Sequence, residues 1–177
     1  MEYSRLSSIN APHFMEAWQL YESSFPQEER RTLEVQEKIM KNTEYNFEVI
    51  LSGDSVLGFI LWWEFKDMVF VEHFATSPEL RGQGHGKTIL QEFLKRSQRP
   101  VILEVELPEP GIKERRIAFY ERLGFALNTH NYVQPPMQKG CGELPLFLMS
   151  YPEKFSKEFV AYFVDNYHPL IYDQGIL

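Results

Sequence analysis

The chain has 177 residues, of which 44% are hydrophobic and 24% are charged. This length and balance fit a single globular domain and exclude a disordered chain. The net charge of −7 argues against general affinity for nucleic acid or an anionic membrane, and it would suit a cationic partner such as an amine.

The chain begins with a predicted strand and a predicted helix. Residues 3–6 form the first short strand. Pro12 stands where helices often begin, and Phe14, Trp18 and Tyr21 follow it at helical spacing.

A second helix is expected after Pro26, which ends the first one because the residue before a proline avoids helical geometry. The charged segment 27–41 predicts this helix, with Leu33, Ile39 and Met40 turned inward.

The composition then changes to strands and helices in alternation. Strands are expected at residues 47–51, 56–64, 68–76, 101–107, 126–133 and 145–150. Helices are expected where apolar residues recur at helical spacing, around Ile89–Leu94, Ile117–Leu123 and Phe155–Phe163 (Phe155, Phe159, Tyr162 and Phe163 on one face).

This order predicts a mixed α/β sheet with helices on its faces. The strand ending at Thr76 and the strand starting at Val101 should be parallel neighbours, because a helix between them provides a right-handed crossover. We see no linker before the last helix, so we expect it to be a packing element or part of a dimer contact.

Composition and segment lengths also bear on the compartment. Cys141 is the single cysteine, which excludes an internal disulfide and fits a reducing environment. The N-terminus has no apolar run of signal-peptide type, and no stretch approaches the roughly 20 apolar residues of a membrane span. We therefore expect a soluble cytoplasmic protein without a membrane partner.

The segment from Ser77 to Lys87 is the clearest candidate binding site. Its three glycines, Gly82, Gly84 and Gly86, let the backbone turn tightly and approach a ligand closely. The helix that follows offers free amides and a partial positive charge, which suits a phosphate group.

Two common phosphate loops fail at this segment. A Walker A loop ending at Gly86-Lys87-Thr88 requires glycine where Arg81 stands, and a Rossmann fingerprint from Gly82 requires glycine at Lys87. The segment does match the pattern Arg/Gln-x-x-Gly-x-Gly/Ala at Arg81, Gly84 and Gly86, and here the sequence resembles the GNAT acetyltransferases.

A second hallmark supports the resemblance. Residues 117–125, Ile-Ala-Phe-Tyr-Glu-Arg-Leu-Gly-Phe, look like the GNAT helix that ends in Tyr-Glu-x-x-Gly-Phe. The resemblance covers roughly residues 3–151. Members of the superfamily often carry a cofactor-contacting Asn seven residues before this tyrosine, whereas this chain has Lys113, which departs from that pattern.

The resemblance implies a GNAT fold, with a mixed central sheet of about six or seven strands, helices on both faces and an extra C-terminal helix. It implies a GNAT domain over residues 1–151, with residues 152–177 as a helical extension packed on the same domain. It also implies that acetyl-CoA binds as co-substrate between two splayed parallel strands, with no metal. The residues expected to hold it are Phe74, Ala75, Thr76, Arg81, Gly82, Gln83, Gly84, His85, Gly86 and Lys87.

The activity implied is transfer of an acetyl group to a primary amine of a small molecule or peptide, by a monomer or homodimer. In the superfamily the tyrosine at position 120 often protonates the coenzyme A sulfur, and an alternative role for Tyr120 is a core aromatic. A backbone amide near Phe74 or Ala75 would stabilise the oxyanion. A GNAT-fold sensor that binds an acyl-CoA without catalysis, and an interaction domain with a purely structural loop, are the alternatives.

The base that deprotonates the amine has several candidates. Strand alternation places Glu104 and Glu106 on one face with Ile102, and Glu104 sits where GNAT enzymes can carry a catalytic glutamate. Glu72 and His73, on the preceding strand, are the other candidates, because a glutamate on this strand is also a common base in the superfamily. They are adjacent, so alternation predicts that they point to opposite faces and that only one of them faces the cleft. A base relayed through water, or no base, also stays open. Residues 25–30 are expected to line the acceptor site or to be a solvated turn.

Overall fold

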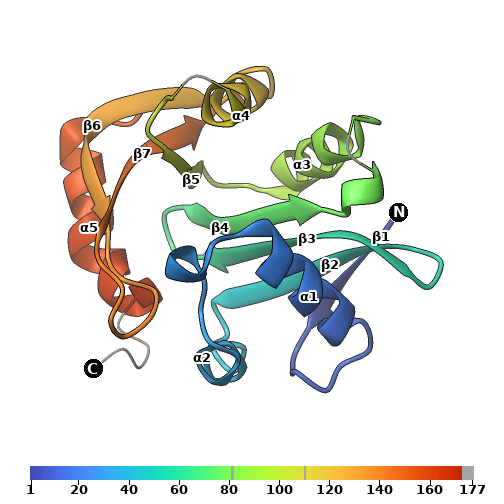
Figure 1. Ribbon diagram of the computed structural model, residues 1–177. Helices are drawn as coiled ribbons and strands as arrows, with labels where there is room; N and C mark the ends of the chain where they lie inside the picture. Colours follow the sequence, from blue (N-terminus) through green and yellow to red (C-terminus); the bar gives the residue numbers. More distant parts are fainter. Residues whose placement is uncertain (81, 110, 173–177) are drawn as a thin grey trace.

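The computed structural model describes residues 1–80, 82–109 and 111–172. Within these residues seven strands form one mixed sheet in the order β1-β2-β3-β4-β5-β7-β6 (Figure 1). The strands are β1 Glu2–Leu6, β2 Tyr45–Ser52, β3 Ser55–Glu64, β4 Val69–Thr76, β5 Val101–Glu106, β6 Ala126–Gln134 and β7 Leu144–Tyr151.

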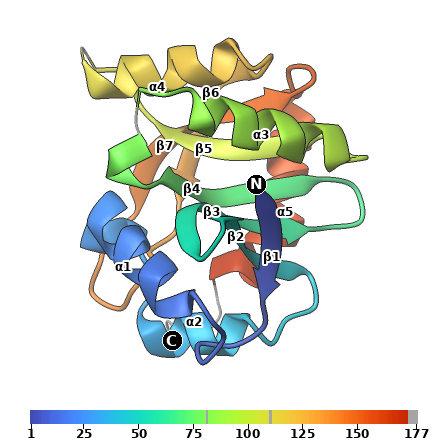
Figure 2. The same cartoon turned by 90° about the vertical axis from the view of Figure 1, so that its right-hand side faces the viewer.

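The helices cover both faces of the sheet (Figure 2). On one face, α1 Phe14–Ser24, α2 Leu33–Ile39 and α5 Lys157–Tyr172 contribute to one buried apolar cluster. On the other face, α3 His85–Arg96 and α4 Ile112–Glu121 contribute to a second cluster. Short 3-10 turns, η1 Gln27–Glu29 and η2 Pro78–Leu80, precede α2 and α3.

The predicted fold class is confirmed, as is the parallel pairing of β4 with β5. The pairing of β5 with β7, and of β7 with β6, is antiparallel. α3 stands between β4 and β5 in the chain and forms the crossover between them, and the glycine segment separates its N-terminus from η2.

The N-terminal helices differ from expectation in detail. Helix α1 begins at Phe14 and not at Pro12, because Phe14 N–H still donates to the Ala11 carbonyl in a turn. The prediction that Leu33 faces inward is wrong: it is 39% exposed. Thr32 caps α2, and the buried positions of this short helix are Gln36 and Ile39.

The predicted apolar face of the last helix is also partly wrong. Phe155 precedes α5, and its N–H donates to the Asn128 side chain. Tyr162 is 40% exposed, whereas Phe163 and Ile171 are buried in the cluster that also holds α1. The division at residue 151/152 stays a prediction, but α5 packs into the same core as the N-terminal helices.

Candidate active site

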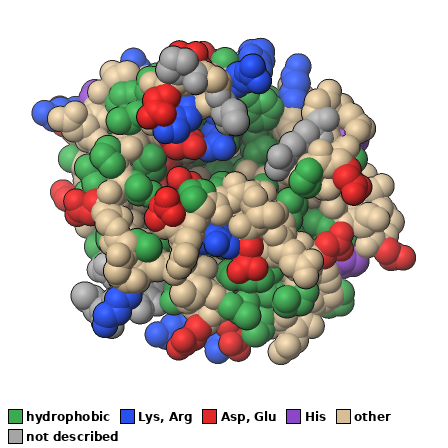
Figure 3. Space-filling view, viewed as in Figure 1, with side chains coloured by type: hydrophobic (Ala, Val, Ile, Leu, Met, Phe, Trp, Pro, Cys, Tyr) green, Lys and Arg blue, Asp and Glu red, His purple; other side chains and the backbone are tan. Residues whose placement is uncertain are grey.

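Strands β4 and β5 pair over a short distance and then separate. Their parallel register covers only Val69 with Val101, Phe70 with Ile102 and Val71 with Leu103, although β4 continues to Thr76 and β5 to Glu106. Residues 73–76 of β4 pair with β3 but not with β5. A cleft of about 850 Å³ occupies this region, and Figure 3 shows the molecule hollowed on this face.

The segment that carries Gly82, Gly84 and Gly86, called the glycine loop below, forms one wall of the cleft. Gly82 and Gly84 have φ of 77° and 82°, a left-handed backbone conformation that residues other than glycine rarely adopt. Among the described residues, no atom lies within 4 Å of the position where a Cβ would stand on either glycine, so these residues leave this face of the loop open. Gly84 also caps α3, so the free amides at the start of that helix adjoin the open loop.

Most, but not all, of the other residues predicted to bind the cofactor line the cleft. Phe74, Ala75, Thr76, Gly86 and Lys87 line the cleft together with the two open glycines. Gln83 and His85 are not among the described residues that line it. The side-chain amide of Gln83 donates through Nε2 to the Glu79 carbonyl at 2.9 Å. Arg81 lies outside the described residues.

Helix α4 adds residues that the motif analysis missed. Arg115, Arg116, Phe119 and Arg122 line the cleft. The sequence shows the adjacent arginines, but whether their side chains point into the cleft depends on how α4 packs against β5. They place positive charge in the cleft that the glycine loop also lines, which would favour a polyanionic ligand. Lys113, at the expected Asn position, instead pairs with Glu109 at 3.0 Å.

A further missed position is Gly58 on β3. A Cβ there would lie 2.5 Å from the Ala75 carbonyl oxygen and 3.2 Å from the Thr76 Cα. Only glycine allows β3 to approach this closely, so Gly58 fixes the position of the β4 backbone that lines the cleft.

The prediction that Glu72 and His73 point to opposite faces is wrong. The register between β3 and β4 shifts so that Leu61 pairs with His73 while Trp62 pairs with Val71. Glu72 is the extra residue of this β-bulge. A bulge breaks the alternation, and both side chains therefore point to the same face, with Glu72 Oε1 3.3 Å from His73 Nδ1.

Glu72 is enclosed by an ion pair. Its side chain is 0% exposed and contacts the guanidinium of Arg31, whose side chain is 2% exposed. The Trp63 indole N–H also donates to Glu72 at 2.8 Å. Arg31 in turn donates to the Ile171 carbonyl in α5 at 2.7 Å.

His73 is buried beside this pair. Its Nε2 lies 2.8 Å from the Glu29 carbonyl oxygen, and because a carbonyl only accepts, the ring must carry a proton on Nε2. Burial, followed by the Arg31 charge, lowers the pKa of His73 to about 4. Phe25 and Glu29, from the predicted acceptor segment, line the same end of the cleft.

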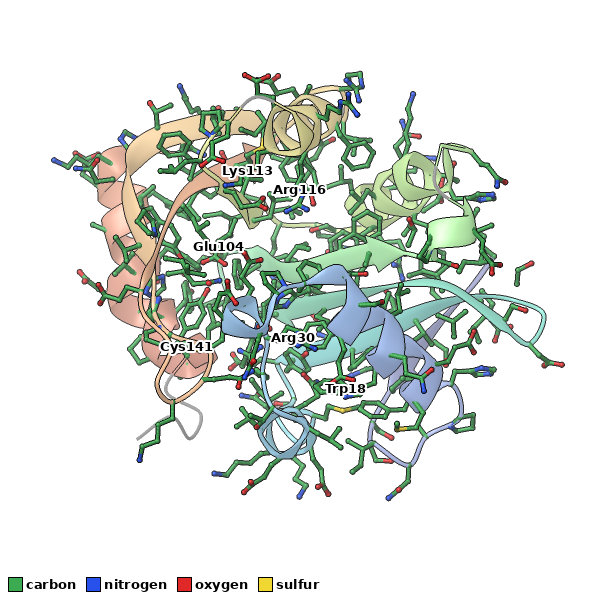
Figure 4. The ribbon with its side chains drawn as sticks, viewed as in Figure 1. Trp18, Arg30, Glu104, Lys113, Arg116 and Cys141 are labelled. Carbon is green, nitrogen blue, oxygen red and sulfur yellow. The ribbon has the colours of Figure 1, made fainter. Side chains whose placement is uncertain are left out.

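Glu104 lines the cleft and has three hydrogen-bond donors. The Tyr132 and Tyr172 hydroxyls donate to Oε1, the latter at 2.7 Å, and the Gln134 amide donates to Oε2 at 2.6 Å. Burial raises the pKa of Glu104, although these hydrogen bonds oppose the effect. In Figure 4, Glu104 lies between the β6–β7–α5 side of the molecule and β4.

Tyr120 lines the cleft from α4 and is 8% exposed. Burial raises its pKa to about 12, so it keeps its proton throughout the neutral range. Glu106, on the same strand as Glu104, is paired with Arg116 at 2.5 Å. Cys141 lies in the loop between β6 and β7 (Figure 4) and is not among the described residues that line the cleft.

Comparison with known families agrees with this geometry. The model of the acetyltransferase (GNAT) family matches residues 12–125, from just before α1 to the end of the Gly-Phe hallmark. The chain belongs to this family. The glycine loop, the separated strands β4 and β5 and Tyr120 all lie within the matched residues.

Solved structures and curated proteins show the same relationship. A proposed GNAT acetyltransferase from Bacteroides thetaiotaomicron is 33% identical, with a TM-score of 0.90 over 97% of this chain and 98% of that one. The proposed acetyltransferase YjbC of Bacillus subtilis is 28% identical, and the match spans 57% of this chain and about half (52%) of that protein. An aminoglycoside 6'-N-acetyltransferase in complex with coenzyme A shares the fold, with a TM-score of 0.61 at 16% identity over 89% of this chain and all of that one.

In the described residues, no helix is both long and apolar enough to cross a membrane. They also contain no group of three or more His, Cys, Asp and Glu side chains arranged to hold a metal ion.

Proposed function

We propose that this protein is an acetyl-CoA-dependent N-acetyltransferase that acetylates a primary amine of a small molecule or peptide. The observation that carries the proposal is that the glycine loop, the separated β4 and β5 strands, Tyr120 and Glu104 line one cleft. A candidate proton donor and a candidate proton acceptor therefore lie in the same cavity as a helix start whose free amides suit an anion.

The residues present fit acetyl-CoA. The open faces of Gly82 and Gly84 and the amides at the start of α3 suit its pyrophosphate. Lys87, Arg115 and Arg122 would add charge beside it. The backbone of Phe74, Ala75 and Thr76 would bind the pantetheine arm, because β5 does not pair with it there. When bound, acetyl-CoA supplies a thioester whose acetyl carbon is open to attack by an amine.

The chain's own residues would then manage the protons. An alkyl ammonium has a pKa of about 10.4 and must lose a proton before it can attack. Glu104 is the base in this proposal, since burial raises its pKa and makes its carboxylate a stronger proton acceptor. Tyr120 would give its proton to the departing sulfur, and a backbone amide near Phe74 or Ala75 would face the developing oxyanion.

Glu72 has a different role in this proposal. Its carboxylate is fully buried and paired with Arg31, so protonating it would leave the guanidinium uncompensated. We therefore assign Glu72 to holding Arg31 beneath the acceptor end of the cleft. The sensor alternative predicts the same binding of acetyl-CoA but no transfer.

The test is a screen of amines with acetyl-CoA, read by release of free thiol and by the mass of the acetylated product. The panel contains aminoglycosides, polyamines, aryl-alkyl amines and peptides with free N-termini. Tyr120→Phe should lower kcat at least about 10-fold with the best amine. A rate unchanged in this variant would remove Tyr120 from the mechanism, and binding without turnover of any amine would favour the sensor.

A further inference from the structure

The C-terminal helix reaches the candidate base directly. Tyr172, in the last turn of α5, donates its hydroxyl proton to Glu104 Oε1 at 2.7 Å. The neighbouring Ile171 carbonyl accepts from Arg31, which holds Glu72. One helical turn therefore contacts Glu104 and the arginine that pairs with Glu72.

A second path runs from α5 through β6. The Tyr132 hydroxyl donates to Glu104 and lies 2.8 Å from His168 Nε2. Tyr132 has one proton, and an ionised carboxylate only accepts, so that proton goes to Glu104. The Tyr132 oxygen must then accept from His168, which fixes the proton of this buried histidine on Nε2.

The donors leave a defined part of Glu104 free. A carboxylate has about four positions for hydrogen bonds. Tyr132 and Tyr172 take both positions on Oε1, and Gln134 takes one on Oε2. Among the described residues no further donor reaches Oε2. Glu104 lines the cleft, so the remaining position is available to an ammonium proton there.

We propose that Tyr172, Tyr132 and His168 are positioning residues for the amine-deprotonating carboxylate, which makes α5 part of the active site. They hold Glu104 ionised and keep one Oε2 position open toward the acceptor. All three lie beyond residues 12–125, which the family model matches. The inference rests on the proposed function for the role of Glu104, but the geometry of its donors does not.

Helix α5 offers a matched control. Tyr167 lies on the same helix and is also buried, at 7% exposed, but its hydroxyl donates to Asp67 at 3.0 Å. Tyr172→Phe removes a donor to Glu104, and Tyr167→Phe removes a donor elsewhere. The titratable groups that face Glu104 are Tyr132 from β6, Tyr172 from α5 and His73 from β4.

The first measurement needs no acceptor. Protein is labelled with ¹³C at the glutamate carboxyl carbons, and the Glu104 resonance is identified by its loss in Glu104→Gln. Removing a hydrogen bond to the ionised form should raise the pKa of Glu104 in Tyr172→Phe and leave it unchanged in Tyr167→Phe. An equal pKa in wild type and both variants overturns the proposal. Tyr132→Phe should raise the pKa as well, and it serves if Tyr172→Phe does not fold.

The second measurement uses the best amine from the screen. Tyr172→Phe should lower kcat about 10-fold, shift the acid limb of the kcat–pH profile to higher pH, and leave the KM for acetyl-CoA within about 2-fold of wild type. An unmoved acid limb contradicts positioning. If Glu104→Gln keeps full activity, the base role fails, while the carboxyl titration still decides whether α5 controls Glu104.

Discussion

Tyr172 and Glu104 are 68 positions apart in the sequence and are joined by a hydrogen bond of 2.7 Å. The bond connects the last turn of α5 to the middle of β5, the strand that forms one wall of the cleft. It brings the C-terminal helix into contact with a residue that lines the cleft, in addition to covering one face of the sheet.

Replacing Glu104 by glutamine should affect the chemical step. Glutamine keeps the size of the side chain but cannot accept a proton, so kcat should fall about 100-fold. Acetyl-CoA affinity should be unchanged, because Glu104 is not among the residues assigned to acetyl-CoA in the proposal. Steady-state kinetics with the best amine, combined with calorimetry, measure both quantities. A variant with wild-type kcat would exclude Glu104 as the base.

Replacing Glu72 by glutamine should affect stability instead. The change leaves the Arg31 guanidinium buried without its counter-charge, and breaking a buried pair in this way costs about 3–5 kcal/mol. Urea denaturation should show this loss, whereas kcat of the folded fraction should fall much less than in Glu104→Gln. A stable variant with the larger fall in kcat would reverse the two assignments.

Gly58→Ala, on β3, should displace the part of β4 that lines the cleft. A methyl group there would meet the Ala75 carbonyl at 2.5 Å, so β3 and β4 must move apart, at a cost of about 1–3 kcal/mol. Acetyl-CoA should bind more weakly because residues 74–76 shift. The control is Gly142→Ala, where no atom of the described residues lies within 4 Å of the added group. Equal stability and affinity in the two variants would show that Gly58 does not position β4.

Stability should fall on mild acidification. Burial lowers the pKa of His168 from 6.5 to about 4, so between these values the unfolded chain binds the proton and the folded chain does not. The contribution of His168 is thus complete above pH 6.5 and decreases as pH falls toward 4, by about 2 kcal/mol between pH 7.5 and 5. His168→Gln keeps a donor for Tyr132 and removes the titration. The difference in unfolding free energy between the two pH values should be smaller in this variant than in wild type. An unchanged difference would contradict the claim that His168 is neutral in the folded protein.

The sequence was most informative where the structure is local. Alternation and helical spacing predicted the strands and the order of the elements. The glycine spacing together with residues 117–125 indicated the family. These features depend on residues close together in the chain, so a pattern can reveal them.

Features that depend on tertiary contacts were not predictable. The bulge at Glu72 reverses the alternation expected from its neighbours, and no residue type in that strand marks it. The donors to Glu104 come from β6 and α5, across β7, and their meeting depends on how the last helix packs. The inward placement of Leu33 failed because a helix as short as α2 buries only part of its apolar surface.

Calorimetric titration of acetyl-CoA into the full chain tests the central claim most directly. We expect saturable binding at one site, weakened in Lys87→Glu, which reverses a charge lining the cleft. Lys95→Glu, on the exposed side of the same helix and paired with Glu92, should bind like wild type. The absence of heat at millimolar acetyl-CoA, or an equal effect of the two lysine variants, would contradict a coenzyme A site at the glycine loop.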